Sequence, residues 1–381
     1  MRVEAASFPM SFRIAVKHSS AVRRTTDNVI CRATSDSGVV GIGEGCPRPY
    51  VTGETTFTAR AFLRAHGPEA GRAAAVDGLA GLNRWIAQNR SVVDQNPAAT
   101  AALEIAVADM TAKTYGVPIE DVFGQPRLTG TFTYTAVIGD SGPLVHGLLL
   151  RSYLWNRFRD VKLKLSGDLL RDQQKMQLLR SRRDVRVRVD ANNLWTEVGS
   201  CIDHLRRLET DLFAIEEPLA VGDLAGFAEV ATALRTRVVL DESALRPDQL
   251  LDLPGDPSLW ILNCRVSKMG GIGRSLETIA AARDVGLGIV VGAQVGETSV
   301  LSRAALTVAA AAGRDLLGQE GAFGTLLLRR DLTEPVLRFD RTGRIRSGRQ
   351  VDPDAQGLGL EARDGVLADV EDVGNHRQPP N

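Results

Sequence analysis

Charged and amide side chains follow short apolar runs at regular intervals through the middle of the chain. Successive groups lie 25 to 28 residues apart, and they are Lys162 and Lys164, Asp190 and Asn192, Glu216 and Glu217, Asp241 and Glu242, and Lys268. Carboxylate oxygens are the ligands that Mg²⁺ prefers, and three carboxylates brought together without a cation would repel one another. We therefore predict that Asp190, Glu216 and Asp241 bind a divalent metal, Mg²⁺ with Mn²⁺ as the alternative.

Lysines bracket these carboxylates in the sequence. Lys162 and Lys164 are two residues apart on an expected strand, so both side chains point to the same face. Two ammonium groups in a shielded site lower each other's pKa, which would make one of them a base near neutral pH. Lys268 follows an expected strand four units later, on the far side of a closed barrel. A lysine on each side of a bound substrate can remove a proton from one face and return one to the other.

Each of these residues also has an ordinary structural explanation when it is taken alone. A single lysine at a strand end is usually solvated, with its aliphatic stem over apolar surface. A single aspartate after a strand, such as Asp241, is often a helix N-cap, and the proline after Glu217 could simply end a strand. Five consecutive strand ends with matching chemistry favour an active site instead.

The elements that must position these residues are short apolar strands alternating with longer charged helices. The strands expected in this zone are 132–138, 161–165, 185–189, 212–215, 237–240, 259–266, 287–291 and a weak one at 316–318. Strand–helix alternation predicts a parallel sheet, and eight units predict a closed barrel of the (β/α)₈ type. Barrel enzymes build their active sites at the carboxyl ends of the strands, so we expect the charged residues to converge there.

Three zones are expected along the chain. Residues 1–129 are predicted to form an α+β domain, with strands at 12–16, 28–33 and 39–42 and a clear helix after Pro97. Residues 130–324 form the barrel. Residues 325–381 are a strand-like C-terminal segment, whose last part, 374–381, is expected to be disordered.

The composition excludes several classes of partner. The 46 basic residues balance the 46 acidic ones, so the formal net charge of zero gives no attraction to nucleic acid or to an anionic membrane. No apolar run is long enough to span a bilayer. The four cysteines include no Cys-x-x-Cys pair, which argues against a zinc site and favours a reduced, cytoplasmic setting.

The order of these motifs resembles the enolase superfamily, and more narrowly its muconate-lactonizing enzyme subgroup. The matching motifs are Lys-x-Lys, Asp-x-Asn, Glu-Glu-Pro, Asp-Glu-Ser and Lys-x-Gly-Gly, together with residues 43–55 in the first zone. The resemblance covers nearly the whole chain. It implies a (β/α)₇β modified TIM barrel with an N-terminal α+β capping domain, completed by the C-terminal segment. A homo-oligomer is expected from the resemblance alone.

The resemblance also implies roles for individual residues. Asp190, Glu216 and Asp241 match the metal ligands, Lys164 the catalytic base with Lys162 tuning it, and Lys268 the opposing acid or base. The shared chemistry is removal of a proton α to a carboxylate, which gives an enediolate held by Mg²⁺. Two capping loops, at 19–26 and 47–54, would close over the barrel mouth. The residues expected to bind substrate are Thr135, Asn192, Glu242, Glu297, Arg48 and Tyr50, with Arg48 pairing a second carboxylate.

Several reactions share this machinery, all on a small-molecule carboxylate substrate. The first is racemisation or epimerisation of a dipeptide or an N-acyl amino acid, which the loop around Tyr50 and the two lysines favour. The second is cycloisomerisation of the muconate type or an o-succinylbenzoate-synthase-like dehydration, which needs a single base. The third is a barrel kept for binding without turnover. Gly296 and Glu320 depart from the pattern of many dipeptide epimerases, so an amino-blocked substrate stays open.

Overall fold

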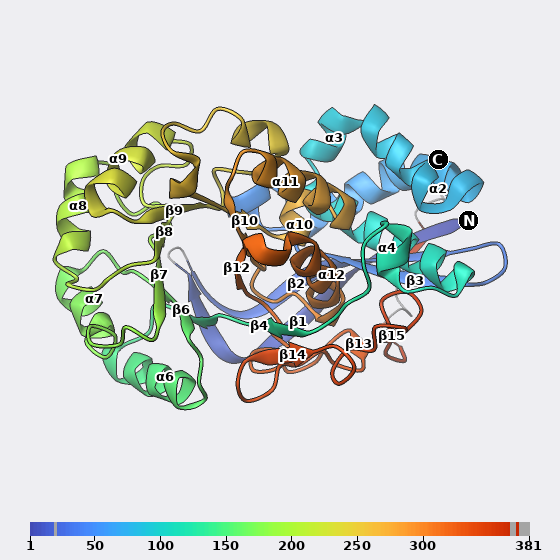
Figure 1. Cartoon of the computed structure of the whole chain (residues 1–381). Coiled ribbons are helices and arrows are strands. Elements are labelled where there is room, and N and C mark those ends of the chain that lie inside the picture. Colours follow the sequence, from blue (N-terminus) through green and yellow to red (C-terminus); the bar gives the residue numbers. More distant parts are fainter. Residues whose placement is uncertain (19–20, 366–370, 373–381) are drawn as a thin grey trace, which may run out of the picture.

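The computed structural model describes residues 1–18, 21–365 and 371–372, arranged as a capping domain beside a barrel (Figure 1). The cap contains an antiparallel sheet in the order β16-β1-β2-β3, with β1 (Arg2–His18), β2 (Ala21–Thr34) and β3 (Val40–Gly45). Its helices are α1 (Pro49–Thr52), α2 (Thr56–Gln88), α3 (Arg90–Asp94), α4 (Pro97–Tyr115) and α5 (Ile119–Val122).

Helix α4 lies directly on the sheet because glycines on β3 leave room for it. Gly41, Gly43 and Gly45 share one face of the strand, and a Cβ at Gly43 would collide with the carbonyl oxygen of Ala102. The close approach buries almost every residue of α4. The cap therefore has an apolar layer between helix and sheet, and its buried residues belong to the same cluster as those of the barrel.

The barrel sheet contains eight parallel strands in sequence order. They are β5 (Ala136–Ile138), β6 (Asp160–Lys164), β7 (Arg186–Asp190), β8 (Ala214–Glu216), β9 (Arg237–Leu240), β10 (Trp260–Cys264), β11 (Gly288–Val291) and β12 (Leu316–Gln319). The backbone N–H of Thr135 donates to Gln319 O at 2.7 Å and joins the first strand region to the last. This arrangement confirms the expected (β/α)₇β barrel with an N-terminal cap.

Seven connections link these strands, and most carry an α-helix on the outside of the barrel. The helices are α6 (Pro143–Trp155), α7 (Leu169–Met176), α8 (Val198–Arg206), α9 (Leu224–Leu234), α10 (Val266–Met269), α11 (Ile272–Asp284) and α12 (Ser299–Ala312). The connection from β9 to β10 instead contains two short 3₁₀ turns, η1 (Pro247–Leu250) and η2 (Pro257–Leu259). Prolines at the start of both turns and Gly255 between them prevent a longer helix there.

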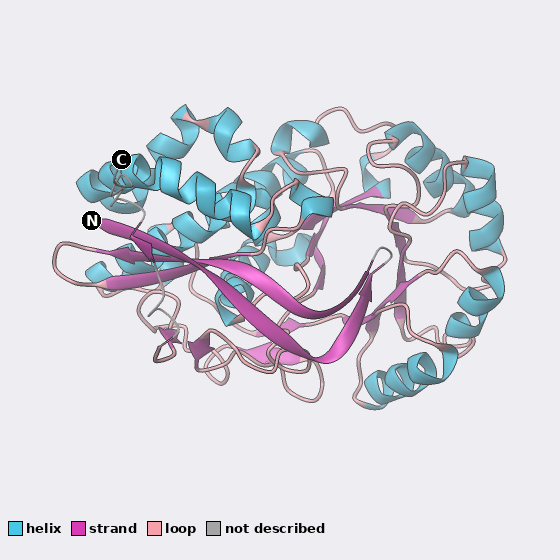
Figure 2. Cartoon of the chain, turned by 180° about the vertical axis from the view of Figure 1, so that it is seen from behind, coloured by secondary structure: helices cyan, strands magenta, loops and turns pink. Residues whose placement is uncertain are grey.

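Two sequence-based expectations about strands differ from the structure. The strand expected at 132–138 is divided, because β4 (Thr131–Thr133) pairs outside the barrel with β14 (Arg344–Arg346). The loop expected at 19–26 is strand from residue 21 onward, since β1 and β2 form one long hairpin. Figure 2 shows this hairpin reaching from the cap toward the barrel. The backbone N–H of Arg13 donates to Leu327 O, so β1 contacts the segment that follows β12.

The C-terminal segment contacts both domains. Strand β13 (Thr333–Glu334) pairs with β15 (Glu361–Ala362), and β16 (Glu371–Asp372) pairs with the outer edge of β1. The tail at 374–381, expected to be disordered, lies outside the described residues. None of the helices that the structure describes has the length and apolar character needed to cross a membrane.

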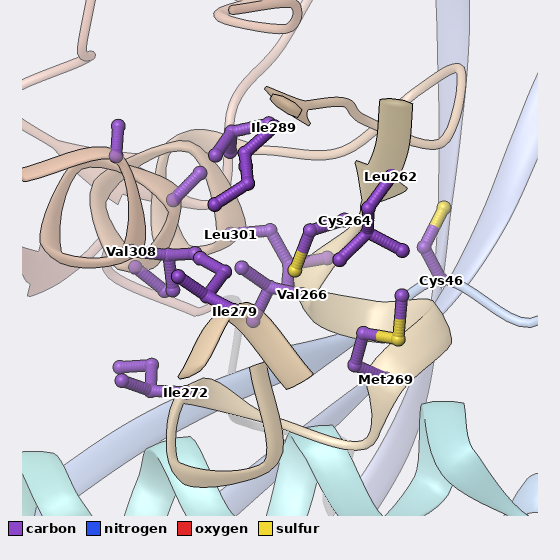
Figure 3. Close-up of a cluster of buried hydrophobic side chains, with 14 of the residues drawn as sticks. Cys46, Leu262, Cys264, Val266, Met269, Ile272, Ile279, Ile289, Leu301 and Val308 are labelled. Atoms are coloured by element: carbon purple, nitrogen blue, oxygen red, sulfur yellow. The ribbon is translucent and has the colours of Figure 1, made fainter. Parts of the chain in front are cut away.

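An apolar cluster fixes the part of the barrel that carries Lys268 (Figure 3). Leu262 and Cys264 from β10 pack against Val266 and Met269 of α10 and against Leu301 of α12, and all five are buried. Burial of this kind contributes roughly 1.5–3 kcal/mol for each large side chain. The short helix α10 is therefore held by side-chain packing, although four residues alone would not form a stable helix.

Buried carboxylates dock the cap on the barrel. Glu44 on β3 accepts hydrogen bonds from the backbone N–H groups of Thr298 and Leu301, where α12 begins. Glu104 on α4 accepts from Ile272 and Gly273, where α11 begins, the second at 2.8 Å. The first N–H groups of a helix lack partners within the helix and attract negative charge. Each carboxylate of the cap thus accepts hydrogen bonds from N–H groups that would otherwise lack partners at the start of a barrel helix.

Candidate active site

The carboxylates at the ends of β7, β8 and β9 lie side by side. Asp190 pairs in register with Lys164 on one side and with Glu216 on the other, and Asp241 directly follows β9. All three carboxylates are almost fully buried, at 1–2% exposure. Parallel strands deliver their carboxyl ends to one face of the barrel, so the sequence spacing brings these side chains together.

Lys162 lies at the centre of this group. Its Nζ is 2.9 Å from both carboxylate oxygens of Glu216, 3.1 Å from Glu320 and 3.7 Å from Asp190. Burial by itself would lower the pKa of Lys162, but the three carboxylates outweigh burial and raise it above its ordinary value. The expectation that Lys162 and Lys164 lower each other's pKa is wrong for Lys162. The carboxylates in contact with Lys162 raise its pKa by more than a neighbouring ammonium lowers it.

Lys164 is the more accessible lysine of β6. Its side chain is 17% exposed, and its Nζ donates to Asn192 Oδ1 at 2.8 Å and lies 3.5 Å from Asp190. Asn192 occupies the left-handed region, with φ at 47°, which turns its side chain back toward the strand end. Asp190 and Asn192 therefore both contact the Lys164 amine, which stays partly accessible.

Lys268 lies on the opposite side of the strand-end cluster, on α10 and not at the end of β10 as expected. Its Nζ donates to the backbone oxygens of Asp241 and Ala244, at 2.7 and 3.1 Å, and to Asp241 Oδ1 at 3.0 Å. Complete burial, followed by the positive charge of Arg265, lowers the pKa of Lys268 to about 7. An amine with such a pKa can accept or donate a proton near neutral pH.

Arg265 is a site residue that the sequence reasoning missed. Its guanidinium contacts the carboxylate of Asp241, lies 3.7 Å from Glu216 and donates to Gln294 Oε1 at 3.1 Å. It stands three residues before Lys268, where α10 begins, and its position relative to the carboxylates depends on that turn. A basic residue immediately after the apolar run of β10 was the available signal.

The donor set suits Mg²⁺, but basic side chains occupy the space between the oxygens. Among the described residues, no three Asp, Glu, His or Cys side chains already surround one point as metal ligands. Arg265 and Lys162 separate Asp241, Glu216 and Asp190 instead. Three hard oxygen donors on adjacent strand ends, with Asn263 Nδ2 donating to Glu216 at 3.2 Å, fit a Mg²⁺ ion once the guanidinium moves aside.

The two glutamates that follow the ligand positions have different surroundings. Glu217 accepts from the backbone N–H groups of Asp241 and Ser243 and from the Ser243 hydroxyl, so it holds the loop after β9. Glu242 Oε2 is buried and has no hydrogen-bond partner among the residues described. Burial and the nearby charges of Glu217, Asp190 and Glu216 raise the pKa of Glu242 to about 7. Among the residues expected to bind substrate, Glu242 thus has a buried carboxyl oxygen, Oε2, that lacks a hydrogen-bond partner among the residues described.

Thr135 and Arg48 are two expected substrate-binding residues whose polar atoms contact protein groups. The Thr135 hydroxyl donates to Asp160 and accepts from Arg188, at the amino-terminal ends of the strands. The Arg48 guanidinium is buried and donates to Pro47 O, Val295 O and the Asn28 side chain. The expectation for Thr135 is corrected, because its hydroxyl lies at the opposite ends of the strands from the lysines. The expectation for Arg48 stays a prediction.

Two other expected substrate contacts lie near the mouth. Tyr50 is on α1 and is 36% exposed. Glu297 is buried beyond β11, where it accepts from the Gln294 N–H at 2.6 Å, and burial raises its pKa to about 8. Burial thus favours the neutral form of the Glu297 carboxyl.

A chain of opposite charges continues from Lys162 down the barrel interior. Glu320 links Lys162 to Arg188, at 3.1 Å on each side, and Arg188 lies 3.4 Å from Asp160. Because both oxygens of Glu320 face protein cations, it does not provide the free carboxylate that a substrate ammonium would need. A separate cavity lined by Arg186 and Asp160 lies at the far end of the strands, away from the lysines.

Comparisons with known proteins agree with this arrangement. Residues 149–366 match the family model described as Enolase C-terminal domain-like. The L-Ala-D/L-Glu epimerase of Bacillus subtilis is 28% identical over 300 residues, which are 77% of this chain and 81% of the relative. The N-succinyl-L-Arg/Lys racemase of Bacillus cereus is 25% identical over 290 residues, covering 74% and 76%.

A solved structure with a similar fold contains both Mg and a dipeptide. It is the dipeptide epimerase from Methylococcus capsulatus complexed with Mg and the dipeptide L-Arg-D-Lys. It superposes with a TM-score of 0.78 at 25% identity, over 94% of this chain and 99% of that chain. The likeness thus extends over the cap as well as the barrel.

Proposed function

Because the chain belongs to the Enolase C-terminal domain-like family and is an isomerase of the enolase superfamily, we propose that it is a Mg²⁺-dependent racemase or epimerase. The substrate is a dipeptide or an N-acyl amino acid, and the reaction exchanges the proton on its α carbon. The observation that carries the proposal is the placement of Lys164 and Lys268 on opposite sides of the buried carboxylates.

Asp190, Glu216 and Asp241 would hold the Mg²⁺ ion. When bound, the ion supplies positive charge that stabilises negative charge developing on the substrate carboxylate. Lys162, already within 3 Å of Glu216, fixes that ligand and adds a second positive charge to the site. The buried surroundings exclude water, so both charges act in a medium of low polarity.

The two lysines would divide the proton transfer. Lys164 Nζ reaches the mouth and removes the α proton from one face of the substrate. Lys268 Nζ, with a pKa lowered to about 7, delivers a proton to the opposite face. Since either lysine can start the reaction, both epimers are substrates and each depends on its own base.

Deuterium exchange tests this function directly. The purified protein is incubated with Mg²⁺ in D₂O and a library of dipeptides and N-acyl amino acids, and α-deuterium is measured by mass spectrometry. We expect exchange into both epimers of an accepted compound. Lys164→Ala should remove exchange from one epimer and Lys268→Ala from the other, each by roughly 10²–10⁴-fold. A wild-type protein that binds Mg²⁺ but exchanges no member of the library would contradict the proposal.

One observation favours a second candidate, a cycloisomerase of the muconate type or an o-succinylbenzoate-synthase-like dehydratase. Lys268 is fully buried and all three of its protons have acceptors, whereas Lys164 is accessible. A single accessible base is sufficient for those reactions. Turnover of muconate-like or cyclohexadiene acids that survives in Lys268→Ala would select this candidate.

A further inference from the structure

A second group of buried charges lies beneath the loop that follows β6. Lys175 on α7 is fully buried, and its ammonium is 2.9 Å from Asp172 Oδ1 and 2.8 Å from Asp140 Oδ1. The same ammonium donates a hydrogen bond to the backbone oxygen of Lys164 at 2.8 Å. The residue proposed as the base is therefore attached through its main chain to a buried ion pair.

Asp172 binds the same loop from its other side. It accepts from the backbone N–H of Ser166 at 2.9 Å, from the Ser166 hydroxyl at 2.8 Å and from the N–H of Gly167 at 3.1 Å. His204 Nε2, on α8, lies 3.2 Å from its second oxygen. Hydrogen bonds to charged groups are about twice as strong as neutral ones, so the loop has little freedom to move.

Stability alone does not account for a lysine at this position. An apolar pair at positions 172 and 175 would fill the same space without the several kcal/mol that burying two charges costs. The ammonium does supply a strong donor to a backbone oxygen at the end of β6. Lys164 Nζ contacts Asn192 at 2.8 Å and Asp190 at 3.5 Å, and whether it reaches both depends on where that backbone lies.

We propose that Lys175 is a positioning residue for Lys164, which fixes the backbone of the base and hence the place of its amine. This inference rests on the proposed role of Lys164 in proton transfer. Lys268 is held separately, by acceptors from Asp241 and Ala244, and none of the contacts of Lys175 reaches it. The effect of losing Lys175 is therefore confined to one face of the substrate.

Lys175→Met tests the proposal, with Lys113→Met as the matched control. Lys113 also forms a close ion pair, 2.9 Å from Asp109, but it lies in the cap. Deuterium exchange is measured for each epimer, and the Lys164→Ala and Lys268→Ala variants show which epimer depends on which lysine. We expect Lys175→Met to slow the Lys164-dependent exchange by about 10–100-fold and to leave the Lys268-dependent exchange unchanged. Equal losses for both epimers would indicate a purely structural role and overturn the proposal.

A second measurement needs no turnover. Trace acetylation with acetic anhydride at one pH in the presence of Mg²⁺, read by peptide mass spectrometry, reports the reactivity of each lysine. Lys175→Met should change the labelling rate of Lys164 severalfold relative to that of Lys268, and Lys113→Met should not. An unchanged rate overturns the positioning role even if the wild type is inactive on every compound. A changed rate in an inactive protein keeps this role and rejects the proposed function.

A third variant tests the proposal if Lys175→Met does not fold. If Lys175→Met fails to fold, Lys175→Gln keeps a donor for the Lys164 backbone oxygen while removing the charge. We expect it to slow the Lys164-dependent exchange less than complete loss of Lys164 does, with the other epimer unaffected. Equal slowing of both epimers in this variant also overturns the proposal.

Discussion

Buried carboxylates occur in two regions of this molecule, and their counter-charges differ. At the strand ends, Asp190, Glu216 and Asp241 face lysine and arginine side chains. Between cap and barrel, Glu44 and Glu104 face backbone N–H groups at helix starts. Both arrangements satisfy charge that burial would otherwise make costly.

The two regions differ in whether the group that faces the carboxylate can move away from it. A side-chain cation can swing away and give its place to a metal or a substrate, whereas a helix N-terminus cannot leave without the helix. The strand-end carboxylates are thus suited to chemistry, and the interface carboxylates to assembly. This comparison predicts that substitutions in the first region affect binding and activity, while those in the second affect stability.

The largest expected effect follows loss of a strand-end carboxylate. Glu216→Gln removes one hard ligand and leaves the buried ammonium of Lys162 without its nearest anion. We expect Mg²⁺ affinity to fall by more than about 100-fold, and α-deuterium exchange with it. Isothermal titration with Mg²⁺ measures the affinity. A variant that binds the ion as tightly as wild type would contradict the role of the strand-end carboxylates in metal binding.

A smaller effect is expected at the interface. Glu104→Gln weakens the hydrogen bonds to Ile272 and Gly273 and should lower the free energy of unfolding by roughly 1–3 kcal/mol, with Mg²⁺ affinity unchanged. Urea unfolding measures the loss. Glu277→Gln, on the exposed side of the same helix α11, is the matched control and should stay within about 0.5 kcal/mol of wild type.

The pH dependence of that loss sharpens the comparison. Burial raises the pKa of Glu104 to about 7, against about 4.3 in an unfolded chain. The folded state therefore holds this proton more tightly, and the stability that the neutral acid contributes is complete below pH 4 and is lost as the pH rises through 7. The gap between wild type and Glu104→Gln should be wider at pH 5 than at pH 8. A gap that widens with pH would show that the charged form is the favoured one.

The smallest effect concerns the cation beside the ligands. Arg265→Met removes the guanidinium that contacts Asp241, so a metal no longer competes with it. We expect Mg²⁺ to bind several times more tightly, with no gain in unfolding free energy in the absence of metal. Titration at two ionic strengths separates this local competition from general screening. Weaker binding would instead assign Arg265 a role in holding the ligands.

The sequence predicted the strand-end cluster well because it depends on a simple period. Residues one βα unit apart must arrive at one face of a barrel, whatever their neighbours are. Thus Asp190 and Glu216 were placed beside each other from spacing alone, and the structure pairs them in register. The cap and barrel layers followed from hydrophobic pattern in the same way.

Features set by tertiary contacts were not predictable in this way. Arg265 reaches Asp241 because α10 turns the chain after β10. The guanidinium of Arg48, predicted to bind substrate, donates to Val295 O and so joins the cap to the segment after β11. The raised pKa of Lys162 depends on Glu216 and, after it, on Glu320, which is far away in the sequence. Such pairings depend on which side chains meet inside the barrel, and local sequence does not encode this.

The pairing of β16 with β1 has a consequence for the order of folding. Glu4 and Ala5 lie opposite Asp372 and Glu371, so β1 acquires its outer neighbour only after the barrel strands between them in the chain have been synthesised. Until then one edge of β1 presents unpaired N–H and C=O groups, which are a template for association with other chains. This edge of β1 is therefore covered only after the whole barrel has been made.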